Sequence, residues 1–444
     1  MNRTLLKTGA VVTMDSGRRI LPGGGIVVAG DRIERVVEEK ELRDLPPFEG
    51  EVVDARRLVA VPGFVQTHLH LCQSLFRGLA DGLPLLDWLK LRIFPFEAAH
   101  TAASMHASAM AGIAELIRSG TTTILDMGSI HHEEEVVRAI EETGLRAFVG
   151  KAMMDVNTLY PSFIEPTAES LAATRRQAEQ WHGSAGGRIR YAVAPRFVLS
   201  CTDRLLREAY EMTKDGMLFH THAAENRNEM DAVRKRCGMQ NVEFFESIGV
   251  LHANTCLAHC IWLNEREVGL LRDRQAKVAH CPSSNLKLGS GIARVPELMA
   301  RGISVSLGAD GAPCNNTLNM FEEMRLAALI QKPEHGAESM AAQTVFEMAT
   351  VGGAAALGLG GDVGIIEQGR KADIVLLDLE RVWNPYEPGG MYSAIVYSGS
   401  AENVRGVLVD GRWLYRGGEH TTLDESQVVH TARVELHRLL QRVT

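Results

Sequence analysis

The chain has 444 residues, of which 45% are hydrophobic and 23% are charged, the balance of a globular protein large enough for a full core. Its formal net charge of -8 argues against a nucleic-acid or anionic-membrane surface, because such surfaces reward clustered Lys and Arg. We therefore expect a small-molecule substrate.

The cysteines and the N-terminus bear on the compartment. Seven cysteines, an odd number, are scattered along the chain without a Cys-x-x-Cys pair, so a disulfide framework is not expected. Residues 1–7 contain no sustained apolar stretch, and no later run approaches the length of a membrane span. These features predict a cytoplasmic protein without membrane contact.

Taken in chain order, the pattern changes at residue 61. Short β-branched runs separated by turns fill residues 1–60, and after them brief apolar strands alternate with longer segments of helical period. The expected strands are 61–70, 121–127, 146–153, 190–197, 217–225, 255–260, 277–281 and 303–310. Eight strands alternating with helices over ~250 to 300 residues indicate a (β/α)8 barrel, whose active site forms at the C-terminal ends of its strands.

Strand-like alternation returns after the barrel, at 364–378 and 404–415, and the tail 424–443 has apolar residues at helical spacing, typical of a capping or interface helix. The sequence thus predicts an α/β protein with a TIM-like barrel over 61–362. A small β-sandwich domain is expected from both chain ends, 1–60 and 363–444, the latter including the terminal helix. We also expect a homo-oligomer, a dimer or larger.

Chemically potent residues occur where the expected barrel strands end. His68 and His70 lie two residues apart, so they share one face of the first strand and form half of a metal site. Later strand ends carry His222 with Glu225, His259, His280 and Asp310. Three histidines and one carboxylate, His68, His70, His222 and Asp310, form a catalytic metal set with room for water, although any single histidine could instead be a core residue bonded to backbone.

Residues near this set have candidate roles in proton transfer. Glu225, three residues after His222, is expected close to the metal but not on it, where it can move protons; an ordinary helix first-turn acid is the alternative. His259 could steady developing charge or be a core histidine. His220, one layer deeper than His222, suits a supporting role or none.

Two further polar residues are expected near the substrate. Arg196 ends the fourth strand, where a buried guanidinium is costly unless it meets an acceptor. That acceptor could be a substrate carbonyl or a carboxylate within the barrel. Gln73 could contact a heterocycle through its amide or be a solvated loop residue.

These motifs resemble the amidohydrolase superfamily, in particular its mononuclear purine and triazine aminohydrolases. The stretches that carry the resemblance are 62–70, 222–225, 257–260, 280–288 and 308–311. The resemblance implies one divalent metal, zinc or alternatively iron(II), held by the four residues above, and catalytic roles for Glu225, His259 and Asp310. A binuclear site with a carboxylated lysine is disfavoured, because strand four carries Arg196 and Lys151 lies on strand three.

The branch within this superfamily stays open. Residues 146–151, 195–197 and 225–227, with Gln73, are similar to guanine deaminase. Residues 75–78, 311–316 and 321–325 are similar to the methylthioadenosine, S-adenosylhomocysteine and 5′-deoxyadenosine deaminases, in which a histidine usually replaces Arg196. The resemblance implies substrate contacts from Gln73, Trp88, Glu97 and Arg196, with Glu97 as an acceptor for ribose hydroxyls.

The expected reaction is hydrolysis of an exocyclic amino group to an oxo-heterocycle and ammonia. A metal-activated water attacks the ring carbon, Asp310 takes its proton, Glu225 protonates a ring nitrogen and His259 stabilises the attacking oxygen. A guanine-like oxo-base is narrowly favoured, because adenine offers Arg196 no carbonyl. The alternatives are the three nucleosides, a triazine that loses chloride or an alkylamine, and an inactive barrel scaffold.

Overall fold

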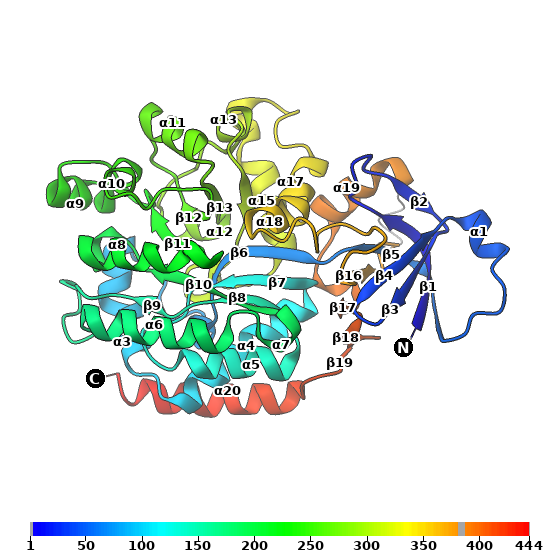
Figure 1. The fold of residues 1–444 in the computed structure, drawn as a ribbon, viewed down its shortest axis with the longest axis horizontal. Coiled ribbons are helices and arrows are strands. Elements are labelled where there is room, and N and C mark those ends of the chain that lie inside the picture. Colours follow the sequence, from blue (N-terminus) through cyan, green and yellow to red (C-terminus); the bar gives the residue numbers. More distant parts are fainter. Residues whose placement is uncertain (1–2, 381–386, 444) are drawn as a thin grey trace.

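The computed structural model describes residues 3–380 and 387–443, and its larger part is a barrel of parallel strands surrounded by helices (Figure 1). Its strands follow one another in chain order around the sheet. They are β6 (Phe64–His70), β7 (Thr121–Asp126), β8 (Arg146–Val149), β10 (Ile189–Pro195) with β9 (Ala152–Met153) beside it, β11 (Leu218–Ala223), β12 (Thr255–His259), β13 (Lys277–His280) and β14 (Val305–Leu307).

The eighth strand closes the barrel in two pieces. β15 (Asp310–Gly311) follows β14 after two residues and pairs in parallel with β6, placing Asp310 opposite Leu69. Gly308 stands at the break, where a Cβ atom would lie 2.6 Å from the backbone oxygen of His68. The eight expected strands and the TIM-like barrel are confirmed, and strand closure brings the ends of strands one and eight side by side.

Helices cover the outside of the barrel. Several begin at a side-chain cap, such as Asn226 before α9 and Asn264 before α11, each of which accepts a hydrogen bond from the helix backbone. The main covering helices are α4 (Ala102–Arg118), α5 (Glu133–Thr143), α6 (Thr167–Trp181), α8 (Asp203–Glu211), α9 (Arg227–Cys237), α10 (Asn241–Ser247), α11 (Glu265–Arg274), α13 (Val295–Ala300), α15 (Met320–Ile330), α17 (Ala342–Ala349) and α18 (Val351–Ala356). Among the described helices, none is both long and apolar enough to cross a bilayer.

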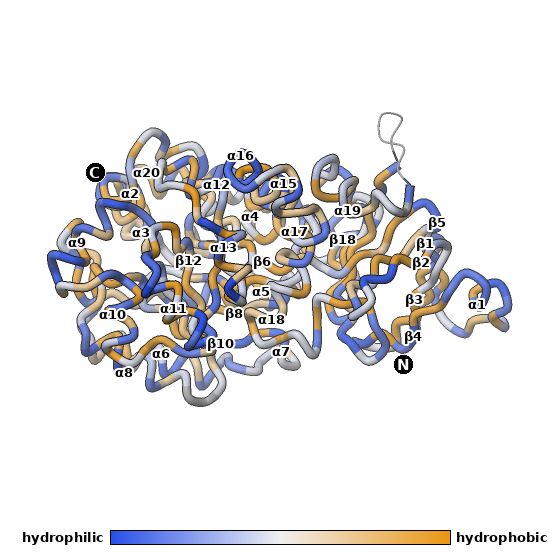
Figure 2. Tube along the Cα trace, turned by 90° about the horizontal axis from the view of Figure 1, so that it is seen from above, coloured by the Kyte–Doolittle hydropathy of each residue, from blue (hydrophilic) through white to orange (hydrophobic). Residues whose placement is uncertain are grey.

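Strands from both chain ends form a second, mixed sheet, which confirms the expected β-sandwich domain. Its order is β19-β18-β17-β16-β5-β1-β3-β4, with β2 paired to β1. Figure 2 shows that β1 and β3 are largely hydrophobic, whereas the loop around α1 (Glu39–Arg43) is hydrophilic. The strands are β1 (Arg3–Val12), β2 (Ile20–Pro22), β3 (Gly25–Ala29), β4 (Arg32–Val37), β5 (Glu51–Pro62), β16 (Ile374–Leu377), β17 (Val404–Val409), β18 (Arg412–Arg416) and β19 (Glu419–His420).

The terminal helix α20 (Glu425–Leu440) leaves this sheet and lies along the barrel, against α4 (Figure 1). Its Leu439 is fully buried in a cluster with Leu75, Phe76 and Phe96. The helix therefore covers a barrel helix and the segment that follows β6, rather than the sheet that precedes it in the chain.

One buried ion pair joins the barrel to the second sheet. Arg146 on β8 donates from Nε and Nη2 to the two carboxylate oxygens of Asp373, at 2.8 and 2.9 Å, and a further hydrogen bond reaches Asp410. The Arg146 and Asp373 side chains are almost completely buried. Because neither charge has access to water, each depends on the other for its stabilisation.

We expect Arg146→Met to lower the free energy of unfolding by about 3 to 5 kcal/mol, because it leaves the Asp373 carboxylate buried without its partner. The control Arg416→Met breaks a half-exposed pair with Glu51 and should cost at most about 1 kcal/mol. Urea titration measures both. Equal small losses would mean that the Arg146 pair contributes no more than a surface pair.

Candidate active site

The four predicted metal ligands meet at the C-terminal end of the barrel. His68 and His70 lie on β6, His222 on β11 and Asp310 on β15, and one donor atom of each falls within 4.8 Å of all the others. All except the partly buried His222 are buried. Residues separated by up to 242 positions in the chain are thus brought to one point by the closure of the barrel.

Hydrogen bonds from the far side of each ring orient the histidines. Nδ1 of His70 donates to the carbonyl oxygen of Met127 at 2.7 Å, and Nδ1 of His222 donates to that of Arg196 at 2.6 Å. Nδ1 of His68 lies 3.0 Å from Nε2 of His220, which gives this deeper histidine a supporting position. Each ring therefore presents Nε2 to the centre of the cluster.

The donor set fits one divalent metal. Nε2 of His68 is buried without a hydrogen-bond partner among the described residues, and Oδ1 of Asp310 lies 3.4 Å from it and 3.3 Å from Nε2 of His70. Burial lowers the pKa of His70 to about 3 and that of His222 well below its usual value, so both rings are neutral, the form that binds metals. Such buried nitrogen lone pairs are costly unless a cation or donor meets them.

The segment after β13 supports Asp310 and His259 through hydrogen bonds, a role that was not expected from the sequence. Ser284, on α12 (Pro282–Lys287), donates to Oδ2 of Asp310 at 2.6 Å, and Oδ1 of Asn285 lies 2.8 Å from Nδ1 of His259. His280 itself is buried, and neither of its ring nitrogens has a partner among the described residues. The motif 280–285 thus contributes to the site through Ser284 and Asn285.

Glu225 and His259 lie beside the donor cluster as expected. Nε2 of His259 is 3.5 Å from Oε2 of Glu225 and 3.9 Å from Oδ2 of Asp310. Burial and then the charges of Asp310 and Glu229 raise the pKa of Glu225 well above its usual value. For Asp310, burial acts in the same direction but hydrogen bonding and charge from His68 outweigh it, so its pKa lies well below normal. The pKa values of these two neighbouring carboxyl groups are thus shifted in opposite directions.

Arg196 has its acceptor inside the protein. Its Nη1 and Nη2 donate to the two oxygens of Glu97 at 2.8 and 3.1 Å, and Gln73 donates to the same carboxylate at 2.8 Å. The salt bridge within the barrel, one of the two alternatives, is therefore the arrangement found. Arg196 therefore does not require a substrate carbonyl, and Glu97 is engaged by protein donors rather than open to ribose.

The cavity at the cluster is small, about 20 Å³, close to the space of one water molecule. Its roof is formed by Leu85 and Trp88 of α2 (Leu85–Trp88) and by Leu89, which begins a π-helical turn (Leu89–Ile93). Arg196 lines this cavity, whereas Glu97 does not. Short π-helical segments occur often at functional sites.

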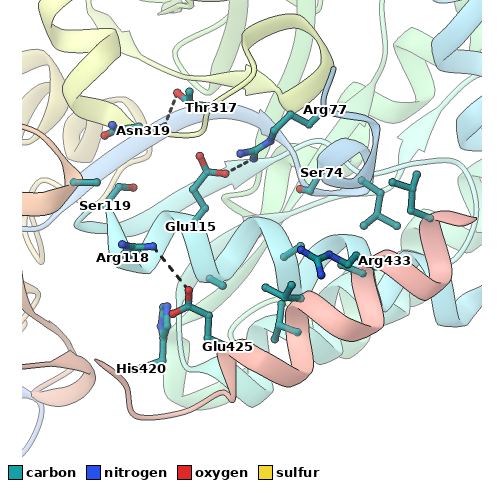
Figure 3. A pocket seen from close by; sticks show the side chains of 18 of the residues that line it. Ser74, Arg77, Glu115, Arg118, Ser119, Thr317, Asn319, His420, Glu425 and Arg433 are labelled. Atoms are coloured by element: carbon teal, nitrogen blue, oxygen red, sulfur yellow. Dashed lines mark hydrogen bonds and ion pairs between the residues drawn. The ribbon is translucent and has the colours of Figure 1, made fainter. Parts of the chain in front are cut away.

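A larger cavity of about 630 Å³ lies elsewhere, between α4 and α20 (Figure 3). Its lining includes the ion pairs Arg77–Glu115 and Arg118–Glu425 and apolar side chains of both helices. None of the predicted metal, catalytic or substrate-binding residues lines it. Cavity size therefore does not locate the chemistry in this molecule, whereas the donor cluster does.

Comparisons with known proteins agree with this geometry. The chain is 40% identical to 5′-deoxyadenosine deaminase of Methanothermobacter thermautotrophicus, over 94% of this chain and 96% of that protein. It is 36% identical to 5-methylthioadenosine/S-adenosylhomocysteine deaminase of Syntrophomonas wolfei, over 90% and 92%. Among solved structures it is similar to an adenosine deaminase from Xanthomonas campestris with bound zinc, with 27% identity, a TM-score of 0.91 and 99% and 98% coverage. Residues 59–414 match the model of the amidohydrolase family, and the chain belongs to that family.

Proposed function

We propose that this chain is a deaminase of adenine nucleosides that carry a modified 5′ position, such as 5′-deoxyadenosine, methylthioadenosine or S-adenosylhomocysteine. It is a hydrolase that acts on C–N bonds in cyclic amidines, as its family and relatives are. The observation that carries the chemistry is the position of Glu225 and His259 beside the metal donors, where Nε2 of His259 lies 3.5 Å from Oε2 of Glu225. The narrower choice of substrate is supported by the relatives.

The reaction needs Glu225 and His259 besides the metal ligands, and it gives the ligand Asp310 a second role. When bound, a divalent metal, for which we propose zinc with iron(II) as the alternative, activates water for attack near neutral pH. Asp310 accepts a proton from the attacking water, and Glu225 gives its proton to the ring nitrogen next to the attacked carbon. His259 stabilises charge on the attacking oxygen. Asp310 then passes its proton to the amino group, which leaves as ammonia, and the hydroxyl proton of the intermediate returns to Glu225, so the oxo product remains.

Two features of the cavity support a nucleoside. The charge of Arg196 is already balanced by Glu97, so the buried guanidinium places no demand for a carbonyl on the base. Trp88 lines the cavity, and its buried Nε1 has no acceptor among the described residues. An indole N–H can only donate, so it suits an acceptor atom of the substrate.

An oxo-purine such as guanine is the second candidate, and a specific observation favours it. Arg196 lines the cavity and uses two of its N–H groups on Glu97, while its other N–H groups have no acceptor among the described residues. A carbonyl on the base could accept from one of them, with Glu97 and Gln73 holding the guanidinium in place.

We expect His222→Ala to lose the metal and nearly all activity, because removal of one imidazole leaves too few donors for tight binding. His280→Asn is the matched control, since it changes a buried histidine outside the donor cluster and should keep the metal. Elemental analysis of protein purified without chelator, together with ammonia release, measures both properties. Full metal content and normal turnover in His222→Ala would refute the ligand assignment.

We expect Glu225→Gln to keep its metal and to lose at least ~10²-fold in kcat, the usual scale for a positioned proton donor. The amide keeps the size of the side chain but carries no transferable proton. Metal content and kcat are measured on the same preparation. Loss of the metal instead would make Glu225 a ligand and contradict the mechanism.

A substrate panel separates the two candidates. We expect adenosine, 5′-deoxyadenosine, methylthioadenosine and S-adenosylhomocysteine to release ammonia with a higher kcat/KM than guanine, isoxanthopterin or ammeline. The double variant Arg196→Met with Glu97→Gln removes both buried charges at once and avoids leaving one unpaired. It should retain preference for the nucleosides. Faster turnover of the oxo-bases, lost in the double variant, would select the second candidate.

A further inference from the structure

A further cavity of about 570 Å³, which we call the second cavity, opens on the same face of the barrel as the metal donors. Its walls come from the segment after β9, the segment after β10, helix α2 and helix α9. Helix α9 begins two residues after Glu225, and the segment after β10 begins at Arg196, whose carbonyl orients His222. The cavity is therefore built by the continuations of strands that form the active site.

The second cavity and the small cavity at the metal donors share a dividing wall. Phe197 lines both, and α2 presents Leu85 and Trp88 to the metal cavity and Leu86 to the larger one. A space of about 20 Å³ at the metal donors is too small for a purine, so binding of the base requires displacement of lining side chains, such as those of α2. Because Phe197 and α2 line both cavities, such a displacement would connect them.

The lining of the second cavity differs in chemistry from that of the metal cavity. Apolar side chains predominate, and the charged residues among its lining are Asp203 and Arg236. Nη2 of Arg236 donates to Asp203 at 2.9 Å, while its Nε and Nη1 have no acceptor among the described residues. The Arg236 side chain is 30% exposed and the Asp203 side chain 58% exposed. Both can therefore meet a ligand without a large desolvation cost.

We propose that this cavity binds the 5′ substituent of the nucleoside and selects substituents that end in an α-amino acid, as in S-adenosylhomocysteine. The thioether chain packs against Phe197 and Leu199, the carboxylate accepts hydrogen bonds from Arg236, and the ammonium group donates to Asp203. A cavity whose lining is largely apolar but carries one cation and one anion matches such a zwitterion in its chemistry. This assignment rests on the proposed nucleoside deaminase function.

The test compares kcat/KM for S-adenosylhomocysteine, methylthioadenosine and 5′-deoxyadenosine, measured by ammonia release from the metal-loaded full chain. Arg236→Met should lower kcat/KM for S-adenosylhomocysteine at least about 10-fold, mainly through KM, because a charge-assisted hydrogen bond is lost. The other two substrates should change less than about 2-fold, since they carry no carboxylate. Arg234→Met, on the same helix but outside the cavity lining, is the matched control and should leave all three unchanged.

A second variant tests volume rather than charge. Ala232→Trp places an indole in the cavity from the surface of α9 and should reduce turnover of S-adenosylhomocysteine while sparing 5′-deoxyadenosine. Equal effects on all three substrates in both variants, or none, would overturn the inference. So would a wild-type enzyme that deaminates 5′-deoxyadenosine but not S-adenosylhomocysteine, and this result would leave the proposed function intact. Failure of every nucleoside would remove the proposed function and, with it, this inference.

Discussion

The structure depends on holding three neutral imidazoles and one carboxylate around a single point in a nearly dry interior. Backbone carbonyls of Met127 and Arg196 fix two of the rings, and β-strand pairing fixes the carboxylate. The strand ends adopt unusual backbone geometry to do so, with positive φ at Ala224, His259 and Asp310. Such strain persists only where the surroundings determine it, and here the closed barrel does so.

The surroundings of the two carboxyl groups of the site shift their pKa values in opposite directions. Burial raises the pKa of both Glu225 and Asp310, but at Asp310 the hydrogen bond and charge of His68 outweigh it, whereas at Glu225 the charges of Asp310 and Glu229 add to it. Burial favours the neutral carboxyl group, whereas a nearby hydrogen-bond donor or positive charge favours the carboxylate. The surroundings of the two groups therefore favour opposite protonation states, as a proton donor and a proton acceptor require.

Hydrophobic periodicity, together with the positions of histidines and acids along the chain, was sufficient to predict the barrel and the set of metal donors. Apolar strands alternating with helices define where strands end, and the fold brings all strand ends to one face, so His68, His222 and Asp310 could be placed together from the sequence. The partner of Arg196 could not be identified in this way, since Glu97 lies in an irregular segment 99 residues earlier. Periodicity carries no information about such loop contacts. The same holds for the supporting hydrogen bond from Ser284.

Arg196 connects the chemistry to the recognition of substrate. Its backbone oxygen accepts from Nδ1 of His222, and its side chain binds Glu97 while stacking near the ring of Phe94 at 5.3 Å. A buried ion pair contributes little net stability, because desolvation offsets the attraction, but it fixes both partners in one position. A change in how the segment after β6 holds Glu97 would therefore shift the strand end that orients a metal ligand. Arg196 therefore links the substrate cavity to the geometry of the metal donors, whereas Asp203 and Arg236 in the second cavity contact neither the donors nor the groups that orient them.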